Sequence, residues 1–187
     1  ASMSAMKKWA KNTQRNHIIV EHNDETGSVD EQDYMKKLTS DVRVVSIVHT
    51  SPVTGMTVDL EKITKEVRNL IPDCIIIVDG IQHSSHGAID VQKYDIDGYV
   101  VSPYKMFSRH GYGVAWASDR LCALNKEQLA DGPFQNWELG TRDAGSYATF
   151  SDVVDYLDWL GSNFTESENT RERLEASSIA IKSHEQE

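Results

Sequence analysis

The stretch from Ile75 to Val114 reads IIIVDGIQHSSHGAIDVQKYDIDGYVVSPYKMFSRHGYGV, and it decides the fold. It opens on a continuous apolar run that ends on an acid, Asp79. A second apolar run, 98–102, leads into a loop that carries Lys105. A strand that is apolar on both faces is typical of the centre of a parallel sheet covered by helices on each side. The stretch therefore predicts an acid and a lysine, each at the end of a strand.

Helical and strand patterns alternate on both sides of this stretch. Apolar residues at a period of 3.6 predict helices, and short β-branched runs predict strands. The expected strands are His17–Glu21, Val42–His49, Cys74–Val78, Tyr99–Val101 and Gly113–Ala117. The expected helix boundaries rest on capping and stop signals: Ser28 with Glu31, Asp59, Pro72, Gly161, and Thr165 with Glu168. This alternation predicts an α/β domain with a mostly parallel sheet flanked by helices.

The two ends of the sequence both read as helices in mid-course. We therefore expect residues 1–187 to be a fragment of a longer protein. In this interpretation residues 1–161 form a large domain that is incomplete at its amino end. Residues 162–187 form a polar connector helix that leads to a carboxyl-terminal small domain outside this sequence.

Composition and charge narrow the class of protein. The chain has 187 residues, 39% of them apolar, which is enough for one domain with a hydrophobic core. Its formal net charge of −10 argues against binding to nucleic acid or to anionic membranes. No apolar run approaches the length of a membrane span, and no leader pattern is present, so we expect a cytoplasmic location. Cys74 and Cys122 lack the spacing of a metal site.

Asp79 and Lys105 are each ambiguous when taken alone. An Asp-Gly pair is common in turns, and most lysines lie on the surface. Together they match what pyridoxal phosphate requires: a lysine for the imine and an acid beside the pyridine nitrogen. Ser102 and Tyr104 supply hydroxyls for a phosphate, and Gln82 supplies an amide for the ring oxygen.

Three motifs carry a resemblance to a known family. VDGIQ, then YVVSPYK, then GYGVAW resemble the fold-type I pyridoxal-phosphate enzymes of aminotransferase class V. The most similar branch contains the cysteine desulfurases and selenocysteine lyases, and isopenicillin-N-epimerase-like proteins are also similar. The interval between the acid and the lysine, 105 − 79 = 26 residues, fits this family.

The resemblance implies a role for each matching residue. Lys105 would form the internal aldimine, a Schiff base, and move the α-proton of an amino-acid substrate. Asp79 would pair with the pyridinium nitrogen. The remaining cofactor contacts would come from Gln82, Ser102, Tyr104, Ser51 and Thr141. In the family the threonine at the position of Thr141 often reaches the phosphate of the neighbouring subunit, so the resemblance also implies a homodimer with shared active sites.

The sequence departs from the family pattern at two positions. Tyr104 stands where the family often has histidine, although a phenol can also donate to phosphate. Pro52 stands where the branch often has asparagine, so a ring contact is lost or passes to Thr50 or Ser51. The family's ring-stacking residue would fall just before Ala1. Its substrate-binding arginine and catalytic cysteine would fall beyond residue 187.

Several polar residues near these loops have two readings. Arg109 and Arg142 are candidates for binding a substrate carboxylate, and each is equally a surface or interface residue. His49 is a candidate acid-base or substrate-binding group, although a hydrogen-bonded structural histidine is the favoured interpretation. His83 and His86 have a spacing compatible with zinc, but loop histidines are the simpler interpretation because no further ligand cluster accompanies them.

Two classes of function therefore remain. The first is a pyridoxal-phosphate enzyme, a transferase or lyase, that acts on an amino acid by desulfuration, transamination or epimerisation. The second is a non-catalytic scaffold that keeps the fold without the chemistry. A nucleotide-binding module is a poor third interpretation, because neither of the glycine-rich phosphate-binding motifs, GxGxxG and GxxxxGK(S/T), occurs in the sequence.

Overall fold

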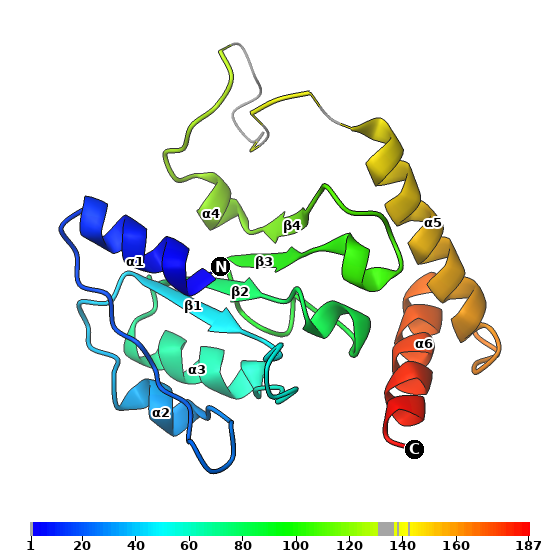
Figure 1. The fold of residues 1–187 in the computed structure, drawn as a ribbon, viewed down its shortest axis with the longest axis horizontal. Coiled ribbons are helices and arrows are strands. Elements are labelled where there is room, and N and C mark those ends of the chain that lie inside the picture. The colour runs from blue at the N-terminus through cyan, green and yellow to red at the C-terminus, as the bar shows by residue number, and fades with distance from the viewer. Residues whose placement is uncertain (1, 131–136, 138, 142) are drawn as a thin grey trace. The chain divides into compact units, whose positions relative to one another are not determined.

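The computed structural model describes residues 2–130, 137, 139–141 and 143–187. Four strands form one sheet in the order β1-β2-β3-β4 (Figure 1), and their bounds are Val44–Val48, Ile75–Asp79, Gly98–Val101 and Val114–Ala117. β1 pairs with β2 and β2 pairs with β3, both in parallel. The prediction of a mostly parallel sheet with the isoleucine run at its centre is confirmed.

The described chain divides into two compact units. The first comprises residues 1–82 and 90–100, and the second comprises residues 83–89 and 101–187. The first unit holds the helices α1 Ser2–Asn12, α2 Glu31–Met35 and α3 Leu60–Leu70. The second holds the 3-10 turns η1 His83–Ser85 and η2 Pro103–Met106, and the helices α4 Asp119–Cys122, α5 Ala144–Gly161 and α6 Thr170–Glu185. None of the described helices combines the length and the apolarity that crossing a bilayer requires.

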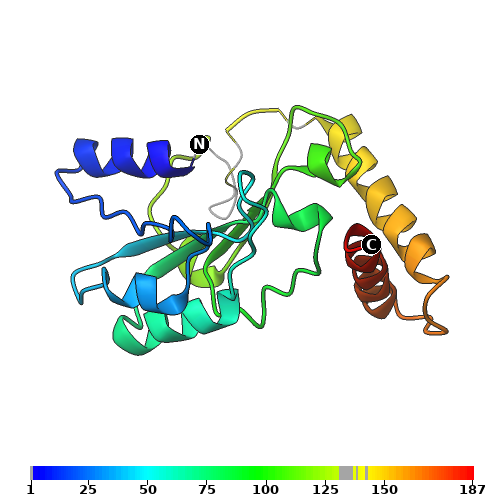
Figure 2. The same ribbon diagram turned by 60° about the horizontal axis from the view of Figure 1, so that its bottom comes forward.

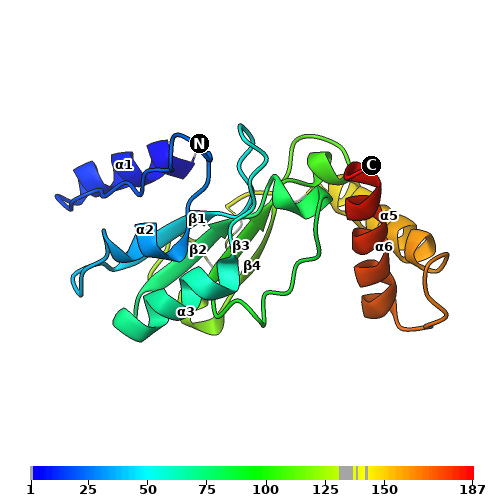
Figure 3. The same cartoon turned by 90° about the horizontal axis from the view of Figure 1, so that it is seen from below.

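The core of the first unit lies between β1–β3 and α3. Ile63 and Val67 of α3 are buried, and so are Ile76 and Val78 of β2. Figure 2 shows α2 and α3 on one side of these strands and α1 on the other; Figure 3 shows the same arrangement from below. Each fully buried aliphatic side chain stabilises the fold by roughly 1.5–3 kcal/mol. The opposite face of β2 is only half-buried, so the expected coverage of both faces is incomplete in the described residues.

The segment His17–Glu21 was predicted to be a strand, and this prediction is wrong. The segment has no regular structure, and Ile18 and Ile19 are 50% and 43% exposed. Its β-branched composition favours an extended backbone, but a strand forms only by pairing with a neighbour. Among the described strands β1–β4, none pairs with this segment.

Both predicted capping boxes are wrong, because competing polar residues lie nearby. Ser28 and Glu31 do not begin α2; Asp30 caps it, with Asp33 completing the box. Thr165 and Glu168 do not begin α6 either, since Asn169 accepts a bond from the backbone N–H of Glu172 at 3.2 Å. The caps move because several acceptors in one loop can satisfy the same N–H groups.

The other predicted boundaries of α3 are confirmed. Asp59 accepts from the backbone N–H of Lys62 at 3.1 Å, and the helix ends at Leu70 before Pro72.

Within the second unit, α6 packs against α5, as Figure 1 shows. The segment expected to be a polar connector helix therefore has a packing partner within the described residues. Ser177 of α6 is fully buried, and a β-carbon added to Gly161 of α5 would lie 1.9 Å from the carbonyl oxygen of Arg173. Gly161 was expected to end its helix, and it is the last residue of α5. Its further role is to permit the close approach of the two backbones.

Replacing Gly161 with alanine is expected to destabilise the α5–α6 pair. Alanine gains up to about 1 kcal/mol of helix propensity, but overpacking against a backbone atom costs about 1–3 kcal/mol and cannot be relieved by a side-chain rotation. We expect a lower urea midpoint, measured by circular dichroism. Ala148→Gly on an exposed part of α5 sets the propensity scale. An unchanged or higher midpoint in the Gly161→Ala protein would contradict the close approach.

Candidate active site

Asp79 ends β2, and both of its carboxylate oxygens have donors. Oδ2 accepts from the Ser2 hydroxyl at 2.5 Å, and Oδ1 accepts from the backbone N–H of Ile81 at 3.2 Å. Its main-chain carbonyl accepts from the His49 N–H at 3.0 Å, as part of the parallel pairing of β1 with β2. The side chain is half-buried. The sheet and α1 together fix the position and the plane of this carboxylate.

His49 lies in a buried aromatic cluster at the end of β1. Its Nδ1 is 2.8 Å from the Tyr99 hydroxyl, and its ring meets the rings of Tyr94 and Tyr99 edge-on. Burial raises the pKa of the Tyr99 phenol, and the nearby Tyr94 and Asp79 raise it further. The phenol therefore stays protonated. These contacts favour a structural role for His49 over substrate binding.

Gly80 lets the Tyr99 ring approach the chain directly after the acid. A β-carbon at Gly80 would lie 2.1 Å from Cε1 of that ring. The Gly80 N–H also donates to the Val100 carbonyl at 2.9 Å, which joins this turn to β3. The glycine of the Asp-Gly pair thus serves packing as well as the turn.

Ser51 and Gln82 are the other two residues of the first unit that were predicted to contact the cofactor. The Ser51 hydroxyl accepts from the backbone N–H groups of Val53 and Thr54, both at 3.2 Å, and so orders its own loop. Gln82 is half-buried, three residues after Asp79.

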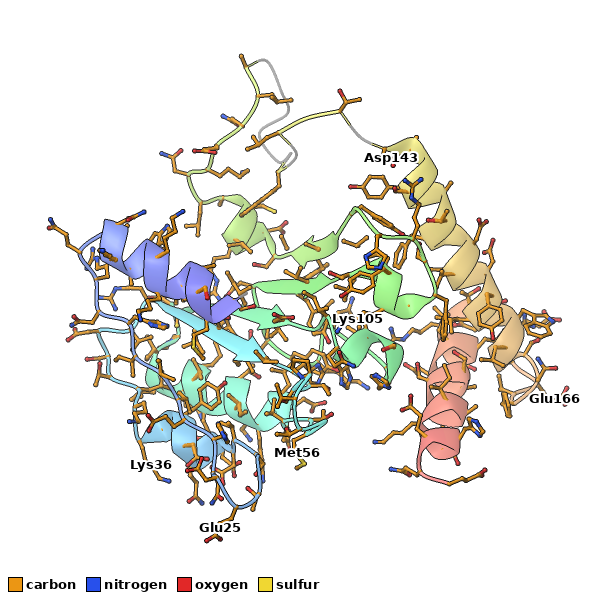
Figure 4. The ribbon with its side chains drawn as sticks, in the orientation of Figure 1. Glu25, Lys36, Met56, Lys105, Asp143 and Glu166 are labelled. Atoms are coloured by element: carbon orange, nitrogen blue, oxygen red, sulfur yellow. The ribbon has the colours of Figure 1, made fainter. Side chains whose placement is uncertain are left out.

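In the second unit, one 3-10 turn carries Ser102, Tyr104 and Lys105. Ser102 is at the amino end of η2, and its hydroxyl makes no capping bond to that turn. The backbone N–H of Lys105 donates to the Ser102 carbonyl at 3.0 Å. Lys105 is half-buried, and Figure 4 shows it in the turn that follows β3. Lys105 therefore follows, three residues later, a serine whose hydroxyl does not cap η2.

The residues around this turn are held by ring and ion-pair contacts. Tyr104 stacks on His110 with ring centroids 4.1 Å apart. Arg109 lies 3.4 Å from Oδ2 of Asp143, and both side chains are more than half exposed. This contact gives Arg109 a carboxylate partner within the chain, which is compatible with either of its two readings.

The remaining predicted contacts lie near the start of α5. Thr141 is exposed, two residues before Asp143 (Figure 4). Arg142 lies outside the described residues.

The paired histidines have separate environments. His86 Nδ1 lies 2.6 Å from Oε1 of Glu185, near the end of α6. His83 is 9% exposed, and burial lowers the pKa of its imidazole. These contacts support the interpretation of both as loop histidines.

Sequence reasoning missed Ser2 and Tyr99 as partners of the predicted site residues Asp79 and His49, and it missed the contact of Ser108 with α5. Ser2 contacts a carboxylate 77 positions away, and Ser108 lies 2.8 Å from Thr149, 41 positions away. No local pattern signals contacts of this range. The tyrosine was visible only as a strand residue.

Comparison with known sequences identifies relatives of this chain. Residues 2–177 match the aminotransferase class-V family. A probable cysteine desulfurase of Mycoplasma genitalium is 31% identical over 88 residues, 47% of this chain and 22% of that protein. A cysteine desulfurase of Wigglesworthia glossinidia brevipalpis is 36% identical over 84 residues, 45% of this chain and 20% of that protein. An aminotransferase-like protein of Gibberella zeae is 30% identical over 139 residues, 72% of this chain and 34% of that protein. The chain thus spans about a fifth to a third of the length of these relatives.

Solved structures share the fold. The cysteine desulfurase CsdA of Escherichia coli superposes with a TM-score of 0.69 at 22% identity, over 89% of this chain and 43% of that chain. The apo cysteine desulfurase of Thermococcus onnurineus superposes with a TM-score of 0.70 at 21% identity, over 88% of this chain and 45% of that chain. The resemblance in the motifs, the sequence match and the fold agree: this chain belongs to the aminotransferase class-V family.

Proposed function

We propose that this chain forms part of a pyridoxal-phosphate enzyme, a transferase or lyase that acts on an amino acid. One observation carries the proposal. Asp79 ends β2 beside Val100 of β3, and Lys105 follows five residues later along the chain. Parallel neighbours end at one edge of a sheet, and ligands of open α/β sheets bind at that edge. An acid that ends one of these strands and a lysine that follows the other fit the cofactor in a member of this family.

The donor set of the described residues fits pyridoxal phosphate. Asp79 would face the pyridine nitrogen and Gln82 the ring oxygen. Ser102, whose hydroxyl does not cap η2, and Tyr104 would hold the phosphate. Thr141 and Ser51 remain proposed contacts, the first to a neighbouring subunit's phosphate. When bound, the cofactor supplies an electron sink for the carbanion at the substrate's α-carbon.

Two side chains would move or hold protons. Asp79 would hold a proton at the ring nitrogen, and its donors, the Ser2 hydroxyl and the backbone N–H of Ile81, would keep the carboxylate in one plane. Lys105 would take the proton from the α-carbon with its side-chain amine. Lys105 is half-buried in the turn that follows β3.

The substrate and the assembly are part of the proposal. Cysteine desulfurases among the relatives support an amino-acid substrate, with cysteine as the first to test. We also propose a homodimer in the cytoplasm.

The test is reduction of the full-length protein with borohydride in the presence of pyridoxal phosphate. We expect a visible absorbance band before reduction, and afterwards one pyridoxyl group per chain on the peptide that contains Lys105, found by mass spectrometry. Lys105→Arg should lose the band and the adduct, whereas Lys93→Arg, at an exposed turn, should keep both. A folded protein that acquires neither would favour the non-catalytic scaffold.

A further inference from the structure

Three hydroxyls form a chain directly after the lysine turn. Ser108 Oγ lies 2.6 Å from the Tyr112 hydroxyl and 2.8 Å from Thr149 Oγ1. Thr149 Oγ1 in turn donates to the Ser146 carbonyl at 2.7 Å. Ser108 and Tyr112 belong to the loop after η2, and Thr149 and Ser146 belong to α5.

The direction of every bond in this chain follows from counting protons. The single proton of Thr149 is committed to the Ser146 carbonyl, so Thr149 must accept from Ser108. The single proton of Ser108 is then committed to Thr149, so Ser108 must accept from Tyr112. The chain runs from the phenol to the helix carbonyl in one direction only. Removing the hydroxyl of Ser108 or of Thr149 therefore leaves a neighbouring half-buried hydroxyl without its acceptor.

Two further contacts bring the same loop to the same helix. Phe107, which follows η2 in a left-handed conformation with φ of 67°, meets the Tyr156 ring edge-on at 6.0 Å between centroids. The Tyr112 ring meets that of Tyr147 at 5.5 Å. The backbone N–H of Ser108 closes η2 by donating to the Pro103 carbonyl at 3.1 Å. The residue that anchors the loop is therefore also the residue that closes the lysine turn.

The amino end of α5 completes a closed circuit. Ser146 donates from its hydroxyl to Oδ2 of Asp143 at 2.7 Å, and the same carboxylate oxygen pairs with Arg109 of the lysine loop. The hydroxyl and the backbone N–H of Ser146 lower the pKa of the Asp143 carboxyl, and Arg109 lowers it further. The circuit thus joins the lysine loop to α5 at two places.

We propose that Ser108 and Thr149 are positioning residues for Lys105, which hold the lysine turn in one orientation against α5. The inference rests on the proposed role of Lys105 and assigns its orientation to a helix that starts 39 residues after it (144 − 105). A purely structural role would instead be to stabilise α5. In that case the loss of one hydroxyl would leave amide exchange over residues 103–113 and the rate of cofactor capture unchanged.

Thr149 offers a matched pair of variants in the full-length protein. Thr149→Val removes the hydroxyl and keeps the shape, whereas Thr149→Ser keeps the hydroxyl and loses a methyl group. We expect amide hydrogen exchange over residues 103–113 to become about two- to tenfold faster in the valine variant only, the equivalent of one net hydrogen bond. The rate at which the absorbance band of added pyridoxal phosphate appears should fall by a similar factor, with the serine variant restoring it.

Each outcome decides the inference. Equal exchange over 103–113 and equal capture rates in the valine variant and the wild type would overturn it. Equal losses in the valine and serine variants would also overturn it, because the methyl group would then be responsible. If the valine variant does not fold, Tyr112→Phe removes only the first donor and should speed exchange at 107–113. A wild type that captures no cofactor defeats the proposed function, but the exchange measurement still decides whether α5 holds the loop.

Discussion

Replacing Asp79 with asparagine is expected to lower the turnover of the full-length protein, in the activity proposed above, on the order of a thousandfold. An amide could not hold a proton on the ring nitrogen of bound pyridoxal phosphate as a carboxylate would, so the ring would be a poorer acceptor of electrons from the α-carbon. Removing one charge of a desolvated pair costs about 3–5 kcal/mol, and each 1.36 kcal/mol at the transition state is a factor of ten. The measurement is kcat with the substrate in excess, after saturation with pyridoxal phosphate.

The loss should not come from unfolding. An asparagine oxygen still accepts from Ser2 or from the N–H of Ile81, which are the donors of the native carboxylate. The matched control is Asp73→Asn, an exposed acid just before the other end of β2, which should keep turnover within about twofold. Wild-type turnover in a folded Asp79→Asn enzyme would remove the acid from the proposed chemistry.

Asp79 and Lys105 were predictable because strand burial leaves a local signal. An apolar run that stops at a charged residue marks the end of a strand, and β2 ends at Asp79 as expected. The strand before Lys105 was equally visible, and β3 ends at Val101. Because β2 and β3 pair in parallel, their carboxyl ends lie at the same edge of the sheet.

Contacts between distant parts of the chain were not predictable. His17–Glu21 has the composition of a strand but no partner among the described strands, and composition cannot supply one. Thr165 and Asn169 are both residues that favour a helix cap, and Asn169 is the one that begins α6. The bond from Ser108 to Thr149 depends on how a loop meets a helix, which no periodicity encodes.

The buried pair of Arg68 and Asp97 carries the largest expected effect on stability. Asp97 is 1% exposed, and its Oδ2 accepts from Arg68 Nη2 and from the backbone N–H of Ile76, both at 2.8 Å. Arg68 also donates to the carbonyls of Pro72, Cys74 and Asp95, so it ties the end of α3 to the entry of β2. This side chain lies at the edge of the sheet opposite to Asp79, and it takes no part in the proposed chemistry.

Arg68→Met should lower the free energy of unfolding by about 3–5 kcal/mol, since it leaves a buried carboxylate without its cation. That is a large share of the roughly 5–15 kcal/mol that holds a domain together. Asp97→Asn should cost less, about 1–3 kcal/mol, because the amide oxygen still accepts from Ile76. The double variant should then cost less than the two single costs added together, because the second change removes the stranded charge.

Urea denaturation measures the stability of all three variants. Arg43→Met, at an exposed arginine just before β1, is the control, and it should change the free energy of unfolding by less than about 0.5 kcal/mol. Additive losses in the double variant would mean that the pair is not coupled, and that the arginine acts through its bonds to the carbonyls alone.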